Sequence, residues 1–82
     1  MKLNKAFALR VREVLKEKHM TQYKLGQETG LYHSTITDIL NCKYQTPNFK
    51  NIALIIRALG MSMTNFFDTE LFDFNQLEIE EK

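Results

Sequence analysis

Two short stretches with helical spacing meet at Gly30, and this junction constrains the fold more than any other part of the chain. Thr21 can cap the first stretch, because its hydroxyl can accept a hydrogen bond from a first-turn N–H. Gly30 follows eight residues after Gln22, and glycine ends helices well because it adopts the left-handed conformation without strain. The second stretch covers 33–41, and its i, i+3, i+4 apolar face consists of Ile36, Ile39 and Leu40. The pattern predicts two short helices joined by a tight turn.

Helical spacing also occurs on both sides of this pair. The preceding apolar series consists of Phe7, Val11, Val14 and Leu15. A fourth helix is expected to open at Thr46 and Pro47, with Pro47 in the first turn, where its missing N–H costs nothing. It is expected to end at Gly60, and Ser62 can cap a short fifth helix. The inner stripe expected for the fourth helix consists of Phe49, Ile52, Ala53, Ile56 and Leu59.

Length and composition fit one small domain. A chain of 82 residues holds one core, and 44% hydrophobic with 26% charged residues is typical of a folded protein. We expect an all-α fold in which residues 1–67 form a five-helix domain and residues 68–82 form an acidic C-terminal tail. The segment 71–79 partly alternates apolar and polar residues, so a strand or an arm is an alternative to a disordered end, which is the default.

The net charge of +1 conceals an uneven distribution. Residues 1–67 contain ten Lys or Arg and four Asp or Glu, for a net charge of +6, whereas residues 68–82 contain one Lys and six Asp or Glu, for −5. A basic body favours an anionic partner, although an ordinary solvated surface is an equal alternative. The tail can fold on the body and compete with that partner, or bind a second chain.

The outward face of the 33–41 helix is polar but nearly uncharged. It consists of His33, Ser34, Thr37, Asp38 and Asn41. Short hydroxyl and amide side chains are poor formers of helix interiors, so helix stability does not account for this face. Its donors and acceptors are of the kinds that read base edges in the major groove of DNA.

The stretch from Gln22 to Leu40 resembles the helix-turn-helix of the lambdoid phage repressor and Cro-like regulators, which include bacterial regulators of the xenobiotic-response-element type. The resemblance covers about residues 7–67 and is carried by MTQYKLGQETGLYHSTITDIL, TPNFKNIALIIRALG and MSMTNFF. It implies a lambda-repressor-like domain that binds double-stranded operator DNA, usually as a dimer, with the third helix in the major groove. Gly26 is then the small residue that lets the second helix lie close to the third.

The resemblance also implies which residues contact DNA. Gln22 matches a position that contacts a phosphate and braces the third helix. The positions that reach base edges are His33, Ser34 and Asp38, with Thr37 beside them. The positions that touch the DNA backbone are Asn41, Lys43, Tyr44 and Gln45. Lys43 and Lys50 add attraction to phosphates.

The residue chemistry agrees with these roles. His33 and Ser34 can donate to guanine or thymine and accept from adenine or cytosine, and the Thr37 methyl can meet a thymine methyl. Asp38 can accept from a cytosine amino group, but pairing with a nearby Lys is an equal alternative. Tyr44 either donates to a phosphate or covers the loop.

Three features depart from the family pattern. Cys42 stands where Gly is usual, so the left-handed cap is expected to move to Asn41; a redox role for Cys42 is less favoured. Tyr32 replaces a hydroxyl cap, and its phenol is too long to cap. Leu15 and Leu40 stand where many relatives have an Arg–Glu pair, which indicates apolar packing in its place.

Other function classes find little support. The chain lacks H-E-x-x-H, G-x-S-x-G and a Gly-rich phosphate loop, and His19, His33 and Cys42 are too widely spaced for a paired metal motif. We therefore expect no enzyme, no metal and no cofactor. The single cysteine, the absence of a signal peptide and the lack of a long apolar run favour the cytoplasm and no membrane association.

The predicted function is sequence-specific transcriptional regulation, with repression favoured over activation because repression needs only occupancy of a promoter. Met61 and Met63 are expected to contribute to a homodimer interface. The rival hypothesis is an antitoxin or adaptor-type module that uses the same fold to bind a protein, with the acidic tail or the Met61–Met63 region as its contact.

Overall fold

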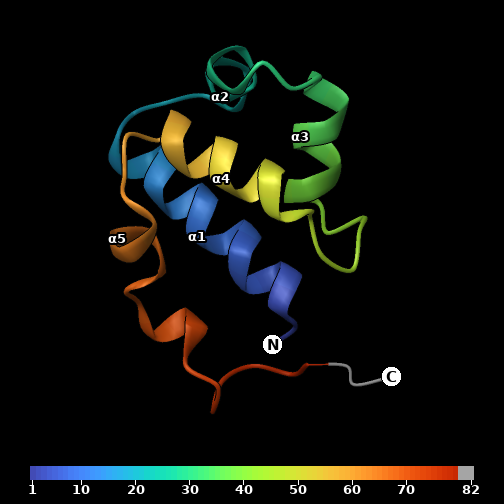
Figure 1. Ribbon diagram of the computed structural model, residues 1–82, viewed down its shortest axis with the longest axis vertical. Helices are drawn as coiled ribbons and strands as arrows, with labels where there is room; N and C mark the ends of the chain where they lie inside the picture. Colours follow the sequence, from blue (N-terminus) through green and yellow to red (C-terminus); the bar gives the residue numbers. More distant parts are fainter. Residues whose placement is uncertain (80–82) are drawn as a thin grey trace.

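The computed structural model describes residues 1–79, which form an all-α fold (Figure 1). The helices are α1 (Leu3–Glu17), α2 (Gln22–Thr29), α3 (His33–Leu40), α4 (Phe49–Ala58), α5 (Met63–Phe67) and the 3-10 helix η1 (Glu70–Phe72). Within this part of the chain β-pairing is limited to one isolated parallel bridge, between Lys2 and Glu78. The expectation of five α-helices is confirmed. No helix in residues 1–79 is long and apolar enough to cross a membrane.

The core lies where α1 and α4 meet the α2–α3 pair (Figure 1). Its largest fully buried side chains are Val11, Val14, Leu25, Ile36, Ile55, Ile56, Leu59 and Phe66. The stripe expected for α4 is wrong at its first position, because Phe49 is 72% exposed. Phe49 is the first residue of α4 and lies beyond the packed layer, whereas Ile55, one turn before Leu59, is fully buried.

Side-chain caps define the starts of the helices. Thr21 accepts a hydrogen bond from Lys24 N at 3.0 Å and Ser62 accepts one from Asn65 N at 3.1 Å, as predicted. The predicted opening of α4 is wrong by two residues: Asn48 caps it, and Asn48 Oδ1 accepts from Asn51 N at 2.8 Å. Asn is among the strongest N-cap residues, so Pro47 precedes the cap instead of standing in the first turn.

Three helix ends share one hydrogen-bond pattern, the Schellman motif. At the end of α3, Lys43 N donates to Asp38 O and Cys42 N donates to Ile39 O. This pairing fixes Cys42 as the left-handed residue, with φ 59°, so the expected move of the cap to Asn41 is wrong. His19 takes the same place after α1, with φ 54°, and Gly60 takes it after α4.

Residues 68–79 pack against the helical body, so the default expectation of a disordered end is wrong for this part of the tail; residues 80–82 lie outside the described residues. The centroid of the Phe72 ring lies 6.2 Å from that of Phe66 and 4.9 Å from that of Phe67. The N-terminal ammonium of Met1 donates to Gln76 O, and Glu78 N donates to Met1 O, each at 2.8 Å. The segment therefore runs alongside α1 and returns to its N-terminus (Figure 1).

Candidate DNA-binding surface

The turn between α2 and α3 holds the two helices in a fixed relation. Gly30 has φ 76° and donates its N–H to Gly26 O, which places glycine where a side chain would be strained. The buried Thr29 hydroxyl donates to Gly26 O at 2.9 Å and accepts from Leu31 N at 3.1 Å. Both partners of this hydroxyl are backbone groups of the turn itself, so the turn is stabilised from within.

Gln22 and Thr37 connect the start of α2 to the outward face of α3. Gln22 Nε2 donates to Thr37 Oγ1 at 3.0 Å. This contact leaves the Thr37 methyl group and the second N–H of Gln22 Nε2 available to a ligand. Ser34 is exposed on the same helix, one turn before Asp38.

His33 is held by two residues of α2. Its ring stacks on that of Tyr23, with centroids 4.5 Å apart and an interplanar angle of 6°. A Cβ on Gly26 would lie 2.6 Å from His33 Nδ1, so only glycine leaves room for the imidazole in this position. The predicted close approach of the two helices at Gly26 is therefore a contact with His33 itself. Tyr23 was not among the predicted site residues, because a single exposed aromatic carries no spacing signal.

Asp38 pairs with the loop that follows α3. Lys43 Nζ lies 3.7 Å from Asp38 Oδ2, and Tyr44 OH donates to the same oxygen at 3.3 Å. The alternative in which Asp38 pairs with a nearby Lys is the arrangement found. Both pairings reduce the repulsion between this carboxylate and a nearby phosphate. Lys43, Tyr44 and Gln45 are all exposed.

Helix α1 supports the end of α3 and its loop. Arg12 Nη2 donates to Leu40 O at 3.2 Å and to Asn41 Oδ1 at 3.3 Å, and Asn4 Nδ2 donates to Tyr44 O at 2.7 Å. Leu15 and Leu40 are both buried in the core, as expected for apolar packing. The sequence did not predict the role of Arg12, which lies one turn before Leu15 on α1.

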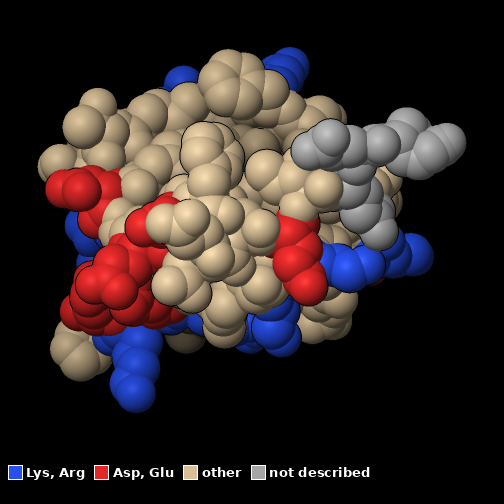
Figure 2. Space-filling view, turned by 90° about the horizontal axis from the view of Figure 1, so that it is seen from below, with Lys and Arg blue, Asp and Glu red and all other residues tan. Residues whose placement is uncertain are grey.

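All nine predicted contact residues thus lie on one continuous stretch formed by the start of α2, the outward face of α3 and the following loop. They are Gln22, His33, Ser34, Thr37, Asp38, Asn41, Lys43, Tyr44 and Gln45. None of them is buried. Seen from below, Figure 2 shows acidic side chains gathered on one part of that face with Lys and Arg beside them, and Glu78 of the tail lines a hollow together with Lys43, Tyr44 and Gln45. Within residues 1–79 no group of three His, Cys, Asp or Glu side chains is arranged to hold a metal ion.

Comparison with known proteins agrees with this geometry. Residues 10–71 match the family model of the Cro/C1-type helix-turn-helix DNA-binding domain. Among solved structures, a mutant of the restriction-modification controller protein C.Esp1396I is similar, with a TM-score of 0.76 and 25% sequence identity over 83% of this chain and 87% of that one. A search of curated proteins gave no match. The family is one of DNA-binding regulators and not of enzymes. The chain belongs to the Cro/C1-type helix-turn-helix family and is a DNA-binding transcriptional regulator.

Proposed function

We propose that the protein is a cytoplasmic repressor that binds an operator as a homodimer, with one α3 in each of two major grooves. The observation that carries the proposal is the outward face of α3, which presents hydrogen-bonding side chains that contacts from α1, α2 and the loop hold in place. Such fixed donors and acceptors discriminate between base pairs because the alternative base leaves them unpaired.

Each predicted residue has a role in this proposal. His33 and Ser34 stand in the first turn of α3, the part of a recognition helix that reaches base edges, and Thr37 offers its methyl group to a thymine. Asp38 accepts from a cytosine amino group through the oxygen that Lys43 and Tyr44 leave free. Gln22, Asn41, Lys43 and Gln45 bind backbone phosphates on either side, and Tyr44 joins them if its O–H turns from Asp38 to a phosphate.

The dimer interface is assigned to the region of Met61 and Met63. Met63 and Phe67 are each 37% exposed, and Met61 is half-buried against the core. Large apolar side chains exposed together mark interaction sites on small proteins. A dimer formed here would bind an operator whose half-sites lie about 34 Å, or one turn, apart.

The test is selection from a random duplex library by the purified protein, followed by sequencing of the bound fraction. The proposal predicts an enriched inverted repeat with half-sites about one turn apart. A matched selection with the double variant His33→Ala/Ser34→Ala should lose that motif while folding is retained. Absence of any enriched motif with the wild-type protein, once folding and dimerisation are verified, would favour the antitoxin or adaptor hypothesis and direct attention to the tail.

A further inference from the structure

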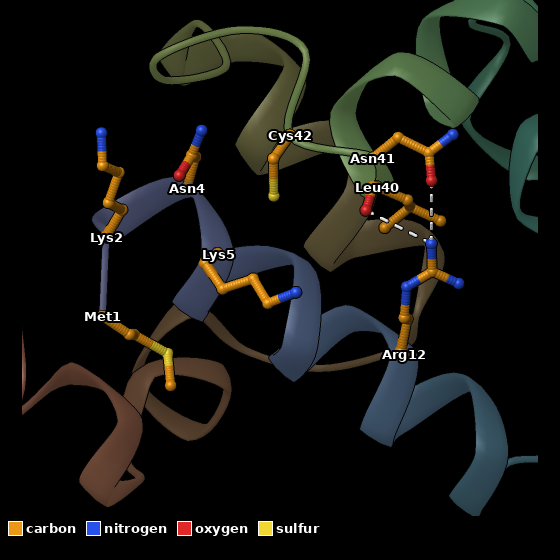
Figure 3. A pocket seen from close by; sticks show the side chains of 8 residues that line it. All are labelled: Met1, Lys2, Asn4, Lys5, Arg12, Leu40, Asn41 and Cys42. Carbon is orange, nitrogen blue, oxygen red and sulfur yellow. Dashed lines mark hydrogen bonds between the residues drawn. The ribbon is translucent and has the colours of Figure 1, made fainter.

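A basic groove lies between α1 and the end of α3, outside the set of predicted DNA contacts (Figure 3). It has a volume of about 640 Å³, and none of the residues that line it within 1–79 is Asp or Glu. Lys5 and Arg12 line it from α1, seven residues apart, and this spacing places them on the same face of the helix. Asn41 lines it from the opposite side. Together with Lys2 and Asn4, which also line it, the groove combines three cationic side chains and two amides, and its lining within residues 1–79 contains no carboxylate.

The side chains in the groove leave donors available to a ligand. Lys5 extends across it toward the end of α3 (Figure 3), and its side chain has no ion pair or hydrogen bond within residues 1–79. Arg12 uses Nη2 for Leu40 O and Asn41 Oδ1, so its remaining N–H groups are open. Because Asn41 accepts from Arg12 through Oδ1, its amide nitrogen is turned outward as a donor.

The groove is continuous with the surface assigned to DNA. Asn41 is itself a predicted backbone contact, and a second hollow next to the groove is lined by Lys43, Tyr44 and Gln45 together with Asn4 of α1. Glu78 also lines this hollow, and its carboxylate lies 3.9 Å from the Met1 ammonium. A DNA strand whose phosphates follow that loop would pass the groove next. Anionic ligands of this kind match a site with several N–H donors and positive charge.

We infer that Lys5 and Arg12, with the outward amide of Asn41, bind a backbone phosphate that flanks the base pairs read by α3. This inference rests on the proposed function and extends the DNA contact to α1. Lys5 supplies charge, and Arg12 is in addition a positioning residue, since it orients Asn41. The site lengthens the footprint on the DNA without adding base specificity, because phosphate contacts carry no sequence information directly.

The test measures affinity for the selected operator as a function of salt, with wild-type protein, Lys5→Gln and the control Lys16→Gln. The control removes the same charge from the same helix at a residue that does not line the groove. Loss of one phosphate contact reduces the magnitude of the negative slope of log K against log salt by about 0.9. This corresponds to about an eightfold loss of affinity at 0.1 M salt if the wild-type and variant lines meet at 1 M. Lys5→Gln should show this change, and Lys16→Gln should keep the wild-type slope.

Methylphosphonate substitution then locates the contact. Replacing one phosphate at a time with a neutral group should weaken wild-type binding at one flanking position and should weaken Lys5→Gln by less at that position, because only the Arg12 and Asn41 contacts remain to be lost there. Arg12→Lys, which keeps the charge but loses the two hydrogen bonds of the guanidinium, should also weaken binding at that phosphate, because Asn41 is no longer oriented toward it. Equal slopes and equal methylphosphonate profiles for Lys5→Gln and Lys16→Gln would overturn the inference, while failure of the wild-type protein to bind any duplex would overturn the proposed function instead.

Discussion

At the scale of single residues, two of the left-handed backbone positions that favour glycine are occupied by other residue types. His19 and Cys42 occupy left-handed positions that glycine fills at Gly60. Cys42 also packs against the core, which offers a reason to retain a side chain there, whereas His19 is exposed. His33, on the recognition helix, has its orientation fixed by Tyr23 and by the missing side chain of Gly26.

His19→Gly should stabilise the protein. A left-handed non-glycine residue costs roughly 1–2 kcal/mol, and the larger entropy of an unfolded chain with glycine offsets about 0.4–1 kcal/mol of that gain. We therefore expect the free energy of unfolding to rise by about 0.5–1 kcal/mol, measured by urea denaturation. As a control, Glu17→Gly within α1 should lower it by about 1 kcal/mol. A lower free energy of unfolding for His19→Gly would contradict the left-handed assignment.

Gly26→Ala should separate folding from DNA binding. Alanine favours the helix by about 1 kcal/mol relative to glycine, but its Cβ would lie 2.6 Å from His33 Nδ1 and displace the ring from Tyr23. Thermal stability should therefore be nearly unchanged, while operator affinity falls by roughly tenfold, the loss of one base contact. In a His33→Ala background the same substitution should have no further effect on affinity. An additional loss in that background would show that Gly26 does not act through His33.

At the scale of helices, the sequence predicted most elements because apolar spacing and caps are local. Thr21, Gly30 and Ser62 each act on their own helix, and all three lie where they were expected. The cap of α4 was misplaced because Thr46 and Asn48 are both good caps, and only tertiary packing selects between them. Arg12 and Tyr23 escaped prediction because their roles depend on contacts between helices.

The negative charge of the tail suggested a role for it, but the sequence did not predict that the tail packs on the helical body. Neutralising its carboxylates through the combined variant Glu70→Gln/Asp73→Asn/Glu78→Gln keeps the Phe72 contacts. If the tail restrains DNA binding by charge, non-specific affinity should rise several-fold at low salt and return to the wild-type value at high salt, where a Debye length of about 3 Å at 1 M screens the interaction. Fluorescence anisotropy with random duplex DNA measures both limits. An unchanged affinity at low salt would exclude this role.

At the scale of the whole molecule, charge and apolar surface are separated. The predicted DNA contacts lie on α2, on α3 and on the loop that follows α3. The exposed apolar side chains Met63 and Phe67 lie on α5, and the acidic tail runs beside α1. In the proposed dimer, this separation would let one chain bind DNA and a second copy at the same time. Two copies would read more base pairs than one, because each helix reads only a few.

Met63→Lys should disrupt the proposed dimer. Burying an unpaired ammonium in an apolar interface costs several kcal/mol, so the variant should sediment as a monomer at concentrations where the wild-type protein is dimeric. Thr64→Lys, the exposed neighbour on α5, serves as the control and should remain dimeric. Monomeric behaviour of the wild-type protein itself, or a dimeric Met63→Lys, would place the interface elsewhere.

The central claim is that α3 reads base pairs, and the ratio of affinities for the selected operator and a scrambled duplex at one fixed salt concentration tests it most directly. His33→Ala and Ser34→Ala should each lower the affinity for the operator by about 10- to 100-fold, the range expected for about 1–3 kcal/mol per base contact. Affinity for the scrambled duplex should stay the same, because backbone contacts are retained. An equal loss on both duplexes, or no loss on either, would contradict the assignment of α3 as the recognition helix.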